Sequence, residues 1–141
     1  MYGAQRCGKI HLNLFISISM PEKEVRSSMN QQHDANTRRL VEAVLSTTGE
    51  TEPALRRTIE VYAAEIGRRP DEQAGKLPAG LVTYVTKVAK YAYKTTGEDI
   101  EALRQAGYSE DAIFEITLSA ALGAAMARLE RGLAVLKGDE R

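Results

Sequence analysis

The chain has 141 residues, of which 43% are hydrophobic, so it is long enough for one domain with a hydrophobic core and too short for two domains of ordinary size. Nineteen basic residues balance nineteen acidic ones, which leaves no net field to attract nucleic acid. The one cysteine, Cys7, excludes a disulfide within the chain and a cysteine zinc site, and it indicates a reducing, cytoplasmic compartment.

Residues 1–35 are expected to be an N-terminal extension that is disordered or loosely docked, and residues 36–141 to form a helical domain. The apolar run from Ile10 to Ile18 is interrupted by polar residues and is shorter than the ~20 residues of a membrane-spanning helix. Its alternation could form a single strand, but the chain has no second strand-like run to pair with it. A signal peptide is disfavoured because the cleavage pattern is poor. No membrane partner is expected.

From Asn36 onward the apolar residues recur at helical spacing. A first helix is predicted from about Thr37 to Thr48, with Gly49 as its stop, and a second from Pro53 to Ile66. The charged residues of the second helix, Arg56 among them, are interpreted as a solvated face. Residues 68–78 contain two prolines and predict a loop, with the option of one helical turn over residues 71–74.

A third helix is predicted to begin at Pro78 and to end before Thr95. Its buried face is expected to consist of Leu81, Val82, Val85, Val88, Ala89 and Ala92. Thr96 with Asp99 three residues later is typical of a capping box, which predicts a fourth helix from Glu98 to Ala106. Gly107 should end this helix in a left-handed conformation.

Ser109 is expected to cap the longest helix, which runs to about Lys137 and has acidic residues in its first turn. Its middle is rich in small residues, and Ser119, Gly123 and Ala127 recur every fourth position. Small side chains at this spacing let another helix approach closely. The Ser119–Ala127 face therefore predicts either a tight core within the chain or the interface of a homo-oligomer.

The run from Ala92 to Ala125 resembles the superfamily of alkyl hydroperoxidase D and carboxymuconolactone decarboxylase, most clearly in its corner Ala-Gly-Tyr-Ser-Glu-Asp-Ala-Ile from Ala106 to Ile113. The similarity covers about Leu77 to Leu136. The resemblance implies an all-α, alkyl hydroperoxidase D-like domain of about five helices around a helical hairpin. It also implies assembly into homo-oligomers.

The peroxidase members of the superfamily carry a Cys-x-x-Cys pair before the corner, with a histidine four residues after the second cysteine. Counted back from Gly107, these positions fall near Ala92, Thr95 and Asp99, and none of them matches. Peroxide reduction by that route needs one thiolate to attack and a second thiol to resolve the sulfenic acid. Thiol peroxidase activity is therefore not expected.

Other chemistry has little support in the sequence. No histidine follows His33, so the part of the chain that resembles the decarboxylases lacks a natural proton carrier near neutral pH. Glu115 and Glu130 lack the histidine partners of a helical carboxylate metal site, and no glycine-rich phosphate loop is present. We expect no metal and no cofactor.

A polar cluster occupies the positions at which the superfamily has its active site, and its candidate ligand-binding residues are Tyr91, Tyr93, Lys94, Glu98 and Asp99. One interpretation is that they are helix caps, a lysine on a helix dipole and tyrosines at the edge of the core. The alternative is a pocket for a small organic acid, faced by Glu115 from the long helix. In that case Lys94, Asp99 and Glu115 are the candidate acids or bases.

Three functions are compatible with these patterns. The first is a protein that binds a small organic ligand without thiol chemistry. The second is a decarboxylase-like or other acid–base enzyme acting on a small carboxylate or lactone. The third is a structural homo-oligomer. A cavity at the corner of the third and fourth helices is expected for the first two and not for the third.

Overall fold

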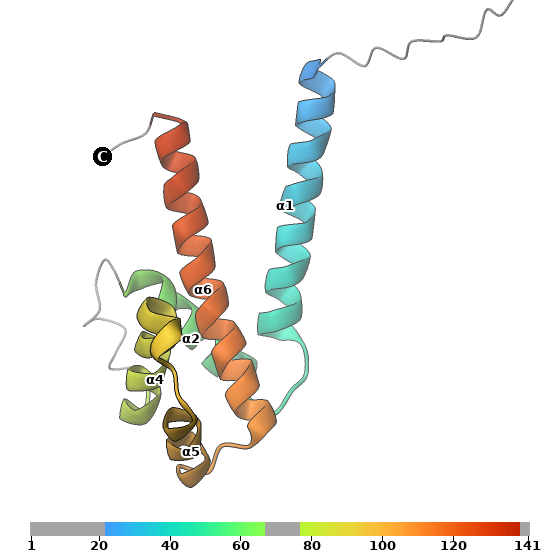
Figure 1. The fold of residues 1–141 in the computed structure, drawn as a ribbon. Helices are drawn as coiled ribbons and strands as arrows, with labels where there is room; N and C mark the ends of the chain where they lie inside the picture. The colour runs from blue at the N-terminus through green and yellow to red at the C-terminus, as the bar shows by residue number, and fades with distance from the viewer. Residues whose placement is uncertain (1–21, 67–76, 139–141) are drawn as a thin grey trace, which may run out of the picture. The chain divides into compact units, whose positions relative to one another are not determined.

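The computed structural model describes residues 22–66 and 77–138, with side chains described from residue 31 onward, and it is all-helical over these ranges (Figure 1). The helices are α1 (Glu22–Ser46), α2 (Pro53–Glu65), α4 (Ala79–Tyr91), α5 (Gly97–Gln105) and α6 (Glu110–Leu136), with a 3₁₀ turn, η1 (Ala92–Lys94), after α4. The all-α prediction is confirmed. Contacts divide the chain into residues 1–34 and 35–141, and the core and the cavities belong to the second unit.

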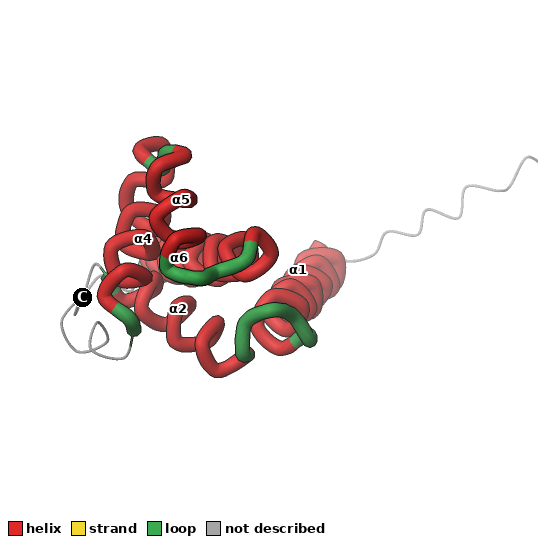
Figure 2. Tube along the Cα trace, turned by 90° about the horizontal axis from the view of Figure 1, so that it is seen from below, coloured by secondary structure: helices red, strands yellow, loops and turns green. Residues whose placement is uncertain are grey.

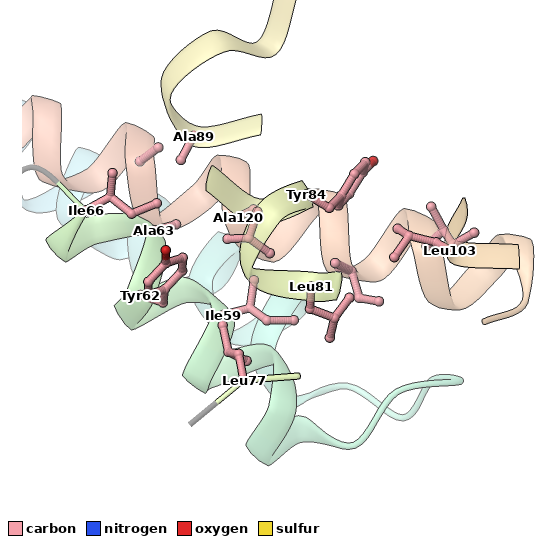
Figure 3. Close-up of a cluster of buried hydrophobic side chains, with 14 residues drawn as sticks. Ile59, Tyr62, Ala63, Ile66, Leu77, Leu81, Tyr84, Ala89, Leu103 and Ala120 are labelled. Carbon is pink, nitrogen blue, oxygen red and sulfur yellow. The ribbon is translucent and has the colours of Figure 1, made fainter. Parts of the chain in front are cut away.

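α6 is the central element of this unit, and α2 and α4 pack against it (Figure 2). The buried apolar cluster joins these helices to α5 (Figure 3). Its best buried members are Ile59 of α2, Leu81 and Val85 of α4, and Ile116 and Ala120 of α6. By length and composition alone, α6 is long and apolar enough to cross a membrane. The core helix of a soluble protein meets the same criteria, and half of the most apolar stretch of α6 is buried within the chain.

The row of small residues on α6 is covered by α2 of the same chain. Ser119, Gly123 and Ala127 are all buried, and a Cβ atom added to Gly123 would lie 2.1 Å from the carbonyl oxygen of Glu60. The two helix backbones therefore approach as closely as glycine permits. Of the two alternatives that this row left open, the structure contains the intramolecular one.

The first helix begins earlier than predicted, at Glu22 instead of Thr37, and ends at Ser46. The segment from Glu22 to Asn36 consists mainly of polar residues and lacks the apolar repeat from which helices are recognised. The apolar run over residues 10–18 and most of the loop over residues 68–78 lie outside the described residues.

The third helix differs from prediction at its end. Ala92, predicted on the buried face, is exposed, because α4 stops at Tyr91 and the 3₁₀ turn that comes next changes the helical period. Tyr84, by contrast, is buried in the core, where its hydroxyl lies 2.8 Å from Thr117 Oγ1.

The caps around α5 and the start of α6 are confirmed. Asp99 and Thr96 form a capping box, in which the Thr96 N–H donates to Asp99 Oδ2 at 2.8 Å. Gly107 has a φ of 94°, the left-handed conformation that ends α5. Ser109 Oγ accepts the N–H of Ala112 at 3.1 Å at the start of α6. These caps fix the corner at which Asp99 is held.

Candidate functional site

A cavity of about 470 Å³ lies between the first half of α4 and α5, and of the residues predicted to form a site it includes Asp99. Its wall is mainly apolar and includes the buried side chains of Leu81 from α4 and Leu103 from α5, with Tyr108 from the turn between α5 and α6. The remaining lining residues are Pro78, Gly80, Thr83, Tyr84, Asp99, Ala102 and Ala106. Its size lies within the range of small-molecule sites, about 300–1,000 Å³.

Asp99 is the charged group in this wall. Lys87 Nζ lies 2.6 Å from Oδ1 and 2.7 Å from Oδ2, and Oδ2 also accepts the Thr96 N–H. The hydrogen bond from Lys87, and after it that from the Thr96 backbone, lowers the pKa of Asp99 below the usual aspartate value. The carboxylate is therefore ionised at neutral pH, and this residue of the cavity wall can accept hydrogen bonds but not donate them.

Tyr84 forms a fixed part of the same wall. The Thr117 hydroxyl donates its proton to the Ile113 carbonyl at 2.7 Å, so in the 2.8 Å contact between the two hydroxyls Tyr84 is the donor. The Tyr84 oxygen is left with acceptor capacity only. Asp99 and Tyr84 are thus both acceptors, and the other polar side chains of the wall are those of Thr83 and Tyr108.

The other candidate ligand-binding residues lie on the surface. Tyr93 is 82% exposed and Tyr91 is 46% exposed, and Lys94 Nζ lies 4.8 Å from the ring centre of Tyr91 and 5.7 Å from that of Tyr93. Glu98 is exposed as well. Of the five candidates, Asp99 alone is part of the cavity wall. Tyr91, Tyr93 and Lys94 form an exposed cation–π cluster instead.

Glu115 belongs to a different cluster, so the expected pairing with Asp99 across one pocket is wrong. Its carboxylate accepts the Glu50 N–H at 2.9 Å, the Thr51 N–H at 2.8 Å and the Thr51 hydroxyl at 2.5 Å, and it lies 3.8 Å from Arg56 Nη1. Desolvation raises the pKa of Glu115, but the Thr51 and Glu50 hydrogen bonds and the Arg56 charge outweigh it and leave the pKa lowered. Glu115 anchors the loop before α2 to α6.

Arg56 is the residue for which the sequence-based interpretation is most clearly wrong. It is 2% exposed, its Nη2 donates to the Thr47 carbonyl, and its Nε has no hydrogen-bond partner among the described residues. The sequence does contain a signal for this burial. Helical spacing places Arg56 on the same face of α2 as the apolar residues Ile59, Ala63 and Ile66. A second cavity of about 470 Å³ lies beside this cluster.

The three positions at which the sequence was inspected for thiols and a histidine are occupied by Ala92, Thr95 and Asp99. Ala92 is exposed in η1, and Asp99 is paired with Lys87. The hydroxyl of Thr95 is buried and has no hydrogen-bond partner among the described residues. The sequence pattern identified Asp99 but not Lys87, because their twelve-residue separation leaves no local signal.

No family model, no curated protein and no solved structure matches the chain. The cavity and the residues in its wall are therefore the basis on which a function can be assigned.

Proposed function

We propose that the chain is a relative of the alkyl hydroperoxidase D and carboxymuconolactone decarboxylase superfamily that lacks the thiol pair and binds a small neutral or cationic organic molecule between α4 and α5. The observation that carries the proposal is the cavity of about 470 Å³ whose apolar wall contains one ionised carboxylate, that of Asp99. The corner from Ala106 to Ile113, on which the resemblance rests, contributes Ala106 and Tyr108 to the wall of the same cavity.

The chemistry of the wall selects the ligand class. Leu81, Leu103 and Tyr108 favour an aromatic or aliphatic body, which gains about 25 cal/mol for each Å² of apolar surface that it buries. Asp99 accepts hydrogen bonds from a hydroxyl, amide or ammonium group. It has no donor for a ligand carboxylate, so the organic acid that the sequence suggested is disfavoured.

Binding is favoured over acid–base catalysis because of the state of Asp99. A general acid or base works best when its pKa lies near the pH of the reaction. The hydrogen bonds from Lys87 and Thr96 lower the pKa of Asp99, which moves it further from neutral pH. The hydrogen bonds from Thr51 and Glu50 have the same effect on the pKa of Glu115. Lys94 lies outside the cavity wall, and so none of the three candidate acids or bases supports the enzyme alternative.

The proposal is tested with three probes of one shape and different charge: benzylamine, benzyl alcohol and benzoate. In an amide NMR titration, the amine and the alcohol should shift the signals of Leu81 and Leu103, and benzoate should not. Asp99→Asn should weaken benzylamine at least tenfold, whereas Glu98→Gln, a neighbouring exposed carboxylate outside the cavity wall, should leave its affinity unchanged.

Two results contradict the proposal. One is equal binding of benzoate and benzylamine, which would show that the Asp99 charge does not face the ligand. The other is no shift at Leu81 and Leu103 with any of the three probes. Helical content measured by circular dichroism confirms that each variant is folded before its affinity is interpreted.

A further inference from the structure

A small cavity of about 180 Å³ lies where α2, α4 and α6 meet, and it shares no lining residue with the cavity that contains Asp99. Its floor is apolar and buried, and it consists of Ala63, Ile66, Ala89 and Ala124. Figure 3 shows the first three of these residues close together. Because alanine side chains are short, they leave space between the three helices. Three long side chains complete the wall of this basic cavity, those of Lys90, Arg128 and Arg131.

The charged side chains of the basic cavity are all cations. Arg128 and Arg131 follow Ala124 at steps of four and three residues, so they lie on one face of α6. Lys90 follows Ala89 in the last turn of α4. Among the described residues, no acidic side chain contributes to the wall. A concave wall with three positive charges attracts an anion.

Carboxylates of the described residues do not neutralise these cations. The ion pairs within residues 31–66 and 77–138 use Arg56, Lys87 and Arg104, and none of them includes a cation of the basic cavity. Two carboxylates of α2 and α6, those of Glu60 and Glu130, interact with each other instead. Desolvation raises the pKa of Glu60, and the charge of Glu130 raises it further. The positive charge of the basic cavity can therefore act on a ligand.

Backbone hydrogen bonds hold the two guanidinium groups in place. Arg128 Nη2 donates to the Ala89 carbonyl at 2.6 Å, and Arg131 Nε donates to the Ala127 carbonyl at 3.1 Å. The first bond also satisfies a carbonyl in the last turn of α4, which would otherwise present a negative partial charge to an anion. A guanidinium has five N–H groups, and the described residues accept one from each arginine. The other N–H groups can donate to a ligand.

The size and the donors of the basic cavity define its ligand. Its volume lies below the range of about 300–1,000 Å³ that is typical of drug-sized ligands, so it suits one small group. Guanidinium groups match the oxygens of phosphate and bind them in a bidentate manner. Three cations also favour a dianion over a carboxylate with a single charge. We propose that the basic cavity binds a phosphate group, either as inorganic phosphate or as part of a small phosphate ester.

An amide NMR titration of the full chain with inorganic phosphate tests the proposal. It is carried out at mildly alkaline pH, where phosphate is a dianion, and in about 0.1 M salt, where a Debye length of about 10 Å screens distant charges. Phosphate should shift the signals of Ala89 and Ala124 and leave those of Leu81 and Leu103, in the cavity that contains Asp99, unchanged. Acetate should bind more weakly. Phenyl phosphate separates the two sources, because tighter binding than that of phosphate indicates an ester and equal binding indicates the free anion.

Two variants test the cations. Arg131→Gln should weaken phosphate about tenfold or more, because charge-assisted hydrogen bonds are lost. Lys90→Gln should weaken it as well, and this exposed side chain makes no hydrogen bond to the described residues whose loss could disturb the fold. The matched control is Lys137→Gln, which changes the net charge equally at an exposed residue outside the cavity wall and should leave the affinity unchanged. Circular dichroism confirms that each variant is folded.

Four results would overturn the proposal. The first is the absence of a shift at Ala89 and Ala124 with phosphate. The second is equal binding of acetate and phosphate, and the third is equal weakening by Arg131→Gln and Lys137→Gln, which would indicate a general effect of net charge. The fourth is binding of a single-stranded oligonucleotide by a chain that does not bind inorganic phosphate.

Discussion

Because the backbones of α2 and α6 approach closely in the core, we expect a side chain added at Gly123 to destabilise the fold. An alanine there would place its Cβ 2.1 Å from the Glu60 carbonyl oxygen and 2.9 Å from the carbonyl carbon. Neither atom can rotate away, because both belong to the backbone of α2. The helix must therefore shift, and with it the core residues Ile59 and Ala63.

The expected magnitude is the difference of two effects. Overpacking a core costs about 1–3 kcal/mol, and an overlap with backbone belongs at the upper end of that range. Replacing glycine by alanine inside a helix stabilises the folded state by roughly 0.5–1 kcal/mol, because glycine loses more conformational freedom on folding. We expect Gly123→Ala to lower the free energy of unfolding by about 2–2.5 kcal/mol in total.

The matched control is Gly132→Ala on the same helix, where nothing lies within 4 Å of the added Cβ. This variant should raise the free energy of unfolding by roughly 0.5–1 kcal/mol. Both are measured by urea unfolding monitored by circular dichroism, at a concentration at which the chain is monomeric. A Gly123→Ala variant as stable as Gly132→Ala would refute the close packing of α2 on α6.

Three further predictions concern the caps and the buried polar groups. Glu115→Gln should cost about 2–4 kcal/mol at neutral pH, because Arg56 loses its buried partner. The pKa of Glu115 is lowered in the folded state. Its contribution to stability is therefore present above the usual glutamate pKa and is lost as the pH falls through the folded-state pKa. The free energy of unfolding of Glu115→Gln should accordingly fall less steeply at acidic pH than that of the unsubstituted chain. Gly107→Ala should cost about 1 kcal/mol or more by left-handed strain alone, as nothing lies within 4 Å of its Cβ, and a thermal melt that matches the unsubstituted chain would contradict this. Thr95→Val should be neutral or stabilising by about 1 kcal/mol, since it removes a buried hydroxyl that has no partner among the described residues, and a loss of stability on urea unfolding would reveal a hydrogen bond there.

The parts of the fold that the sequence predicted well are governed by local signals. Ser109, Gly107 and the pair Thr96 and Asp99 act within three or four residues of themselves, so α5 and α6 begin and end within a residue or two of the predicted positions. The polar N-terminal half of α1 has no such signal and was missed.

In the candidate site too, features set by neighbouring residues could be predicted, whereas contacts between distant residues could not. Asp99 was found because its capping role is local, whereas its ion pair with Lys87 depends on how α4 meets α5. Tyr93 and Lys94 were grouped with Asp99 as sequence neighbours, but the 3₁₀ turn carries them to the surface. Glu115 could not be placed from the sequence, because its partners Glu50 and Thr51 lie more than sixty residues away.

The most direct test of the proposed function is an NMR measurement of nuclear Overhauser effects between bound benzylamine and the methyl groups of the chain. The proposal predicts contacts from the ring protons to Leu81 and Leu103, in the wall that holds Asp99. Contacts to Val44 and Leu118 instead, in the cavity beside Glu115, would contradict it.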